Sequence, residues 1–188
     1  DETLQAIFDI GHETEEWVVR LLSQAGARLT ENERPYELPA LQLSGHIDGV
    51  LQIDGQRVIT DVKSMSPHIF DRVNSVEDLV NSRHTWLRKY PVQLDCYEEM
   101  DRVASRVDEP PPGAFILTNK STGAFKFLPH TFSPERMAAT ETRLRLVNEH
   151  VAAGTLPERV DVEDGWCDRC PFARICLPDE PRQDGLAL

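Results

Sequence analysis

The dipeptide Asp54-Gly55 separates two β-like segments, residues 41–53 and 56–62. Asp-Gly between alternating hydrophobic runs is a strong signal for a two-residue hairpin turn, because such turns need positive φ angles. If Asp54 and Gly55 form the loop, Ile53 faces Gln56, and the pairing of every residue along the two strands is set. No other feature of the chain constrains the fold as tightly.

The predicted register brings acidic residues together. It places Asp48 directly opposite Asp61. Because side chains alternate along a strand, Asp61 and Lys63 share one face, and His46 lies at the same end of it. Opposed like charges destabilise a sheet unless something compensates them, and a bound divalent cation would do so. A solvated hairpin end with an incidental Lys–Asp pair is the alternative that the hairpin alone leaves open.

Hydrophobic periodicity predicts helices on both sides of this hairpin. We expect helices at residues 3–25, in short pieces within 66–81, at 91–107 with Pro91 in the first turn, and at 133–153, and a second hairpin at 114–118 and 124–128. This order predicts an α/β fold in which helices flank a central mixed β-sheet.

The composition is typical of a soluble globular protein. The 188 residues are 40% hydrophobic and 28% charged, enough for one domain with a small appendage. No apolar run reaches the length of a transmembrane helix and no signal peptide is visible, which predicts a cytoplasmic protein without a membrane partner. The formal charge of −12 argues against tight non-specific binding to nucleic acid, but a bound metal could supply positive charge for catalysis.

Four motifs resemble those of one enzyme superfamily. Residues 45–50 (GHIDGV) and 59–64 (ITDVKS) together resemble the core of the PD-(D/E)xK nuclease superfamily, above all its RecB-like exonuclease branch with phage exonuclease-like and CRISPR-associated relatives. The other three motifs are the histidine motif Gly11-His12-Glu13, the Gln-x3-Tyr motif of Gln93 and Tyr97, and the C-terminal triplet Cys167, Cys170 and Cys176. The resemblance spans nearly the whole chain and implies a restriction-endonuclease-like core.

The resemblance implies a role for each matching residue. The implied metal ligands are His12, Asp48, Asp61 and the carbonyl of Val62, and the implied catalytic residues are Asp48, Asp61, Lys63, Gln93 and Tyr97. Gln93 and Tyr97 lie four residues apart and therefore share one helix face. Without the resemblance, His12 would be interpreted as a surface or packing residue and Tyr97 as a core aromatic. We interpret Glu13 and Glu16 as solvated helix charges.

The implied activity is Mg²⁺- or Mn²⁺-dependent hydrolysis of DNA phosphodiesters. The resemblance indicates an exonuclease of recombination, repair, phage replication or CRISPR-related DNA processing, with single-stranded or end-containing DNA as its partner. The alternative is a non-catalytic nucleic-acid-binding module of the same fold, which is weakened because Asp48, Asp61 and Lys63 are all intact. A zinc-binding interaction module built on the cysteine tail explains too little of the chain.

Basic residues stand just before Gln93, and they are Arg83, His84, Arg88 and Lys89. They could guide a single strand past the metal site, with Trp86 or Tyr90 offering a ring face for base stacking. For any one of these residues, a solvated basic segment is the alternative interpretation.

The cysteine triplet has a spacing typical of metal or cluster ligation in a reducing compartment. The resemblance implies that it holds a [4Fe–4S] cluster together with a distant N-terminal cysteine. No cysteine precedes His12. Three explanations stay open: the chain, which begins with Asp1, lacks its native N-terminal segment; Cys96 is the fourth ligand; or the triplet is empty or holds zinc.

The expected domain organisation follows from these motifs. Residues 1–160 are predicted to form the nuclease core, and residues 161–188 a cysteine-rich segment packed on it.

Overall fold

The structure is a computed structural model that describes residues 2–158 and residue 175. The chain divides into two compact units, residues 1–148 and 149–188. Every structural element below except the end of the last helix belongs to the first unit. The three cysteines of the C-terminal triplet lie outside the described residues.

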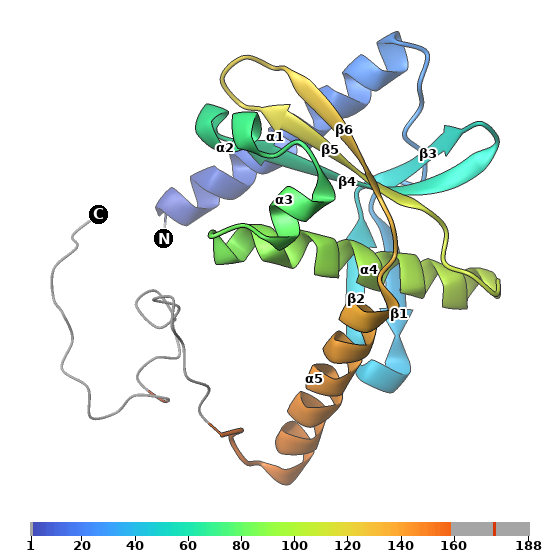
Figure 1. Cartoon of the computed structure of the whole chain (residues 1–188), viewed down its shortest axis with the longest axis vertical. Coiled ribbons are helices and arrows are strands. Elements are labelled where there is room, and N and C mark those ends of the chain that lie inside the picture. The colour runs from blue at the N-terminus through green and yellow to red at the C-terminus, as the bar shows by residue number, and fades with distance from the viewer. Residues whose placement is uncertain (1, 159–174, 176–188) are drawn as a thin grey trace, which may run out of the picture. The chain divides into compact units, whose positions relative to one another are not determined.

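Runs of helices and runs of strands follow one another along the first unit (Figure 1). They are α1 (Glu2–Gln24), β1 (Arg34–Leu38), the 3-10 helix η1 (Pro39–Leu41), β2 (Leu43–Ile47), β3 (Gly49–Ile53), β4 (Gln56–Met65), α2 (Pro67–Arg72), α3 (Val76–Val80), α4 (Thr85–Ser105), β5 (Gly113–Asn119), β6 (Phe125–His130) and α5 (Pro134–Ala153). None of the helices in the described part of the chain is long and apolar enough to cross a membrane.

The central sheet is mixed, as the sequence predicts. Its strand order is β3-β4-β5-β6, and β4 runs parallel to β5 while the other neighbours are antiparallel. Every residue of β5 is buried, which is typical of a strand covered on both faces. The α/β architecture with helices flanking a central mixed sheet is therefore confirmed.

The Asp54-Gly55 turn forms as predicted. Both residues have positive φ angles, 51° and 79°, and the pairing runs in the expected register from Ile53–Gln56 to Gly49–Thr60. The ladder stops there, so the predicted ladder pair of Asp48 with Asp61 is wrong.

The ladder stops because residues 41–53 do not form one strand. The chain bends at Asp48, and β2 leaves the central sheet to pair with β1. His46 therefore lies exposed in a separate two-stranded sheet, away from the face on which the sequence placed it. The sequence does not reveal β1, because only Tyr36 and Leu38 of its five residues are buried and Pro35 tolerates only an edge position.

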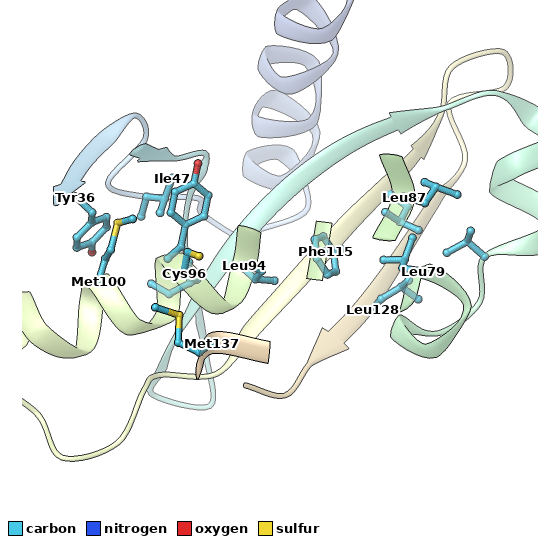
Figure 2. Close-up of a cluster of buried hydrophobic side chains, with 14 of the residues drawn as sticks. Tyr36, Ile47, Leu79, Leu87, Leu94, Cys96, Met100, Phe115, Leu128 and Met137 are labelled. Carbon is cyan, nitrogen blue, oxygen red and sulfur yellow. The ribbon is translucent and has the colours of Figure 1, made fainter. Parts of the chain in front are cut away.

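The strand β4 separates two hydrophobic clusters. Ile59 and Met65 belong to the larger cluster, which includes side chains of α4 and is drawn in Figure 2. Val58 and Val62 point to the other face, where they pack with Val18 of α1. The alternation of side chains along β4 thus assigns α4 to one face of the strand and α1 to the other.

The helix α4 begins six residues before the predicted start at Pro91. A proline inside a helix removes one backbone hydrogen bond, here the bond to the carbonyl of Leu87, and usually marks a first turn. In this helix Leu87 is only 1% exposed and is anchored in the large cluster (Figure 2). Packing therefore outweighs the proline, and Trp86 and Tyr90 belong to the same helix as Gln93.

A glycine directly after the bend at Asp48 makes room for Leu29. A Cβ atom on Gly49 would lie 2.4 Å from Leu29 Cγ. We expect Gly49→Ala to lower the free energy of unfolding by about 1–3 kcal/mol, because Leu29 and the strand must move apart. Gly11→Ala is the matched control, since its Cβ would meet nothing within 4 Å and the helix gains roughly 0.5–1 kcal/mol. Urea denaturation measures the free energy of unfolding of both variants. Equal changes for the two substitutions would contradict the close contact between Gly49 and Leu29.

Candidate active site

Asp61 and Lys63 form an ion pair on the α4 side of β4. Asp61 is 1% exposed, and Lys63 Nζ lies 2.8 Å from each carboxylate oxygen. The ammonium donates a hydrogen bond to Oδ1, while the buried Oδ2 lacks a partner with hydrogen-bonding geometry among the described residues. The predicted placement of both side chains on one face is therefore confirmed.

The charges of this pair depend on each other. Burial raises the pKa of Asp61, and the neighbouring Lys63 ammonium opposes that shift. Burial alone would lower the pKa of Lys63, but the charges of Asp61 and Asp48 outweigh it and the pKa is raised. The neighbouring carboxylates therefore favour the ammonium form of Lys63.

Asp48 reaches β4 through its side chain. At the bend between β2 and β3, its Oδ2 accepts a hydrogen bond of 2.6 Å from the backbone N–H of Val62. Asp48 is also close enough to Lys63 for its charge to raise the lysine pKa. The bend thus brings the Asp48 carboxylate next to the Asp61–Lys63 pair without a ladder contact.

A cavity of about 300 Å³ opens on the α1 side of β4. His12, Asp48 and Val62, three of the implied metal ligands, line it. Asp61 and Lys63 do not line it, because they point to the other face of the strand. Asp48, at the bend, is the residue that both sets share.

Glu16 also lines this cavity. Its carboxylate lies 3.5 Å from His12 Nε2 and 3.5 Å from Arg20 Nη1. These two residues lie one helical turn before and one turn after Glu16 on α1. Glu16 is 53% exposed and His12 67%, so the interpretation of Glu16 as a solvated helix charge is confirmed, although it did not foresee that Glu16 lines the cavity with His12. The spacing of four residues from His12 was the available signal.

Gln93 and Tyr97 contact each other on one face of α4, as predicted. Gln93 Nε2 donates a hydrogen bond of 3.1 Å to the Tyr97 hydroxyl. Burial raises the pKa of Tyr97, and the nearby charges of Asp61 and Asp48 raise it further while Gln93 and Lys63 oppose them. The phenol therefore lies close to both acids.

Gly45 makes room for this phenol. A Cβ atom at Gly45 would lie 2.8 Å from Tyr97 Cε1 and 3.2 Å from its hydroxyl. The glycine at the start of the GHIDGV motif thus permits β2 to approach α4 closely.

Cys96 belongs to the hydrophobic core, as Figure 2 shows. Burial raises the pKa of its thiol to about 11, and the Asp95 charge adds to the shift. A protonated, buried thiol behaves as a small hydrophobic side chain.

A second polar cluster, which sequence reasoning missed, lies between α4, β6 and α5. Asp95, Glu98 and His130 are all buried, with ligand-type atoms within 4.8 Å of one another. Arg136 already occupies this cluster: its Nε and Nη2 donate to the two oxygens of Asp95 at 2.6 and 3.0 Å. The guanidinium supplies the positive charge that a metal would bring. Buried charges scattered over three elements leave no pattern in the sequence that could have revealed them.

The proton positions in this cluster follow from Arg136, which can only donate. Its Nη2 lies 3.0 Å from His130 Nε2, so Nε2 accepts and Nδ1 carries the proton that faces Glu98 at 3.0 Å. Burial raises the pKa of Glu98 to about 7, against the opposing effect of His130. Glu98 Oε2 has no hydrogen-bond partner among the described residues.

The donor set around Asp48 and Asp61 fits a hard divalent cation. Such ions take carboxylate and carbonyl oxygens and neutral imidazole as ligands. Lys63 Nζ lies 2.8 Å from the buried Oδ2 of Asp61 but without hydrogen-bonding geometry, so that oxygen can still take a cation as a ligand. In the cluster around Asp95, both oxygens of Asp95 accept hydrogen bonds, and Glu98 Oε2 is the buried carboxylate oxygen without a hydrogen-bond partner among the described residues.

Comparison with known proteins gives one family. A sequence model described as the PD-(D/E)XK nuclease superfamily matches residues 5–177. Comparison with curated protein sequences finds no match.

Two solved structures are similar in fold. One is a candidate exonuclease from Eubacterium rectale, 18% identical, with a TM-score of 0.51 and coverage of 83% of this chain and 54% of that one. The other, SSO0001, is 16% identical, with a TM-score of 0.45 and coverage of 89% of this chain and 68% of that one. The chain therefore spans about half the length of the first structure.

The raised pKa of Glu98 makes stability depend on pH. Because the pKa of Glu98 in the folded state, about 7, lies above the ordinary glutamate value of 4.5, the folded state binds more protons than the unfolded state between these pH values. The contribution of Glu98 to the free energy of unfolding is therefore fully present below pH 4.5. It is lost as the pH rises through about 7, which lowers the free energy of unfolding by up to about 3 kcal/mol. We expect Glu98→Gln, which resembles the neutral acid, to remove this part of the pH dependence in urea denaturation at a series of pH values.

Glu109→Gln, in an exposed loop, is the matched control and should retain the wild-type profile. A Glu98→Gln profile that falls as steeply as the wild type over the same pH range would show that Glu98 titrates normally.

Proposed function

The chain belongs to the PD-(D/E)XK nuclease superfamily, and we propose that it is a Mg²⁺- or Mn²⁺-dependent deoxyribonuclease of the RecB-like exonuclease branch. The observation that carries the proposal is the buried Asp61, held by Lys63 and lying beside the Asp48 carboxylate that Val62 fixes. Two carboxylates and one ammonium ion in one place leave a negative charge that a bound divalent cation would neutralise.

The proposed metal ligands are Asp48 and Asp61, together with the carbonyl of Val62 and the imidazole of His12. Asp48 links the two sides, because it lines the α1-side cavity with His12 and lies near Lys63 on the α4 side, to which Asp61 points. A bound divalent ion lowers the pKa of the attacking water and neutralises developing negative charge. Glu16 lines the cavity with His12 and is placed to accept a hydrogen bond from that imidazole or from a metal-bound water.

Lys63 would stabilise negative charge on the scissile phosphate. Its partner Asp61 fixes the direction of the ammonium group. Tyr97, held by Gln93, would position the substrate or the attacking water close to both acids. The chain's own residues thus provide charge and orientation for hydrolysis.

An accessible DNA end is the proposed substrate. A chain with a formal charge of −12 has little positive charge for gripping long duplexes, and that electrostatic attraction supplies most non-specific affinity. The similarity in fold to the candidate exonuclease from Eubacterium rectale also supports a DNA end as the substrate. We propose a cytoplasmic role in recombination, repair, phage replication or CRISPR-related DNA processing.

The C-terminal residues complete the proposal. We assign residues 1–160 to the nuclease core and residues 161–188 to a cysteine-rich segment packed on it. Cys167, Cys170 and Cys176 are the proposed ligands of a [4Fe–4S] cluster.

Isosteric neutral substitutions test the site. We expect Asp48→Asn, Asp61→Asn and Lys63→Met each to reduce Mn²⁺-dependent cleavage of labelled DNA by roughly 100-fold or more, since each removes a charge that faces the metal or the phosphate. Glu13→Gln is the control, because Glu13 is an exposed acid next to His12 that does not line the cavity. Near wild-type cleavage by any of the three variants, with the fold verified by thermal melting, would place the active site elsewhere.

Substrate topology tests the end dependence. We expect a linear duplex with single-stranded tails to be degraded, whereas a closed circular plasmid and a single-stranded circle persist, because the site engages a strand end. Gel analysis of the three substrates with Mn²⁺ measures this. Cleavage of the circles at the rate of the linear DNA would identify an endonuclease.

A further inference from the structure

An aromatic and polar stripe runs along one face of α4. Trp86, Tyr90, Gln93 and Tyr97 follow one another at spacings of four, three and four residues, which places all four on the same side of a helix. Tyr97 is buried, Tyr90 and Gln93 are partly buried, and Trp86 is 42% exposed. The stripe thus leads from the acids of the proposed active site to solvent.

The outer part of the stripe is connected to the site by direct contacts. Lys63 Nζ lies over the Tyr90 ring, 5.2 Å from its centroid, while it holds Asp61. The Tyr90 ring meets the Trp86 indole edge to face, with centroids 5.8 Å apart. Two ring contacts therefore separate the catalytic ammonium from an exposed indole.

Packing does not account for the exposure of Trp86. The next residue, Leu87, is 1% exposed and anchors this turn of the helix. The indole rests on the partly buried Tyr90 and beside the ring of His84, 6.0 Å away, with 42% of its surface left to solvent. A large ring supported in this way is suited to receive another flat ring.

The chain segment that carries Trp86 has a charge complementary to that of a nucleic acid strand. Although the chain is strongly acidic, residues 79–94 contain Arg83, Arg88 and Lys89 and no acidic residue. All three basic side chains are exposed. Basic residues and an exposed aromatic ring on one segment are a usual combination in proteins that bind single strands, since the cations attract phosphates and the ring stacks with a base.

We propose that Trp86 stacks with an unpaired base of the DNA strand that enters the active site, so that the substrate is bound as single-stranded DNA. The proposal rests on the nuclease function proposed above and specifies its substrate. Bases within a duplex are already stacked on both faces, so the indole selects a strand that is single-stranded at this position. Stacking tolerates every base, and the selection is therefore one of strandedness and not of sequence.

Equilibrium binding in Ca²⁺ separates recognition from cleavage. A fluorescein-labelled thymidine oligonucleotide and a blunt duplex of equal length are titrated with the full chain, and anisotropy gives the Kd values. Trp86→Leu removes the aromatic ring but retains an apolar side chain, and we expect it to weaken single-strand binding by roughly 5- to 100-fold. Trp86→Phe, which retains a ring, should stay within a few-fold of the wild type.

Phe127→Leu is the matched control. Phe127 is an exposed aromatic residue on β6, 46% exposed, and its cross-strand partner Ile116 belongs to the α1 side of the sheet. We expect this variant to bind the oligonucleotide like the wild type. A 2-aminopurine base in the oligonucleotide gives a second readout, since its fluorescence should be quenched by wild type and less by Trp86→Leu.

The outcomes distinguish this inference from the proposed function. Unchanged single-strand binding by Trp86→Leu, equal weakening by Trp86→Leu and Trp86→Phe, or wild-type preference for the duplex would each overturn the stacking role while Mn²⁺-dependent cleavage could persist. Single-strand binding that depends on Trp86, by a protein that cleaves no DNA with Mn²⁺, would support stacking and refute the nuclease function.

Discussion

The buried ion pair between Asp61 and Lys63 is the interaction on which the site depends. Removing two charges from water costs several kcal/mol for each ion, and a buried pair seldom recovers that cost as stability. Asp61 is 1% exposed and keeps one oxygen without a hydrogen-bond partner in the described part of the chain. The central position of β4, with α1 on one face and α4 on the other, creates this low-dielectric environment, in which charge interactions are strong.

The bend at Asp48 places one carboxylate near both faces of β4. A continuous strand would have left the Asp48 side chain opposite Asp61 within a flat ladder, whereas the bend brings its carboxylate onto the backbone N–H of Val62. The same residue lines the α1-side cavity with His12 and influences the charge of Lys63 on the α4 side. Local irregularity of the backbone, at a point where two sheets diverge, thus assembles the candidate site.

The sequence predicted those parts of the structure that local patterns determine. The hairpin register, the Asp61–Lys63 face and the Gln93–Tyr97 contact follow from alternation, turn chemistry and helical spacing. The bend at Asp48 and the early start of α4 did not follow from these patterns, because β2 pairs with β1 outside the central sheet and Leu87 anchors the first turns of α4 in the core. The cluster of Asp95, Glu98, His130 and Arg136 joins three elements distant in sequence, and only the fold brings them together.

The position of a bound metal ion tests the central claim most directly. Crystals grown or soaked with Mn²⁺ would locate the ion by its anomalous scattering. The account predicts a peak at coordination distance, roughly 2.0–2.3 Å, from carboxylate oxygens of both Asp48 and Asp61. A peak that contacts neither acid, or one that lies among Asp95, Glu98 and His130 with Arg136 displaced, would contradict it.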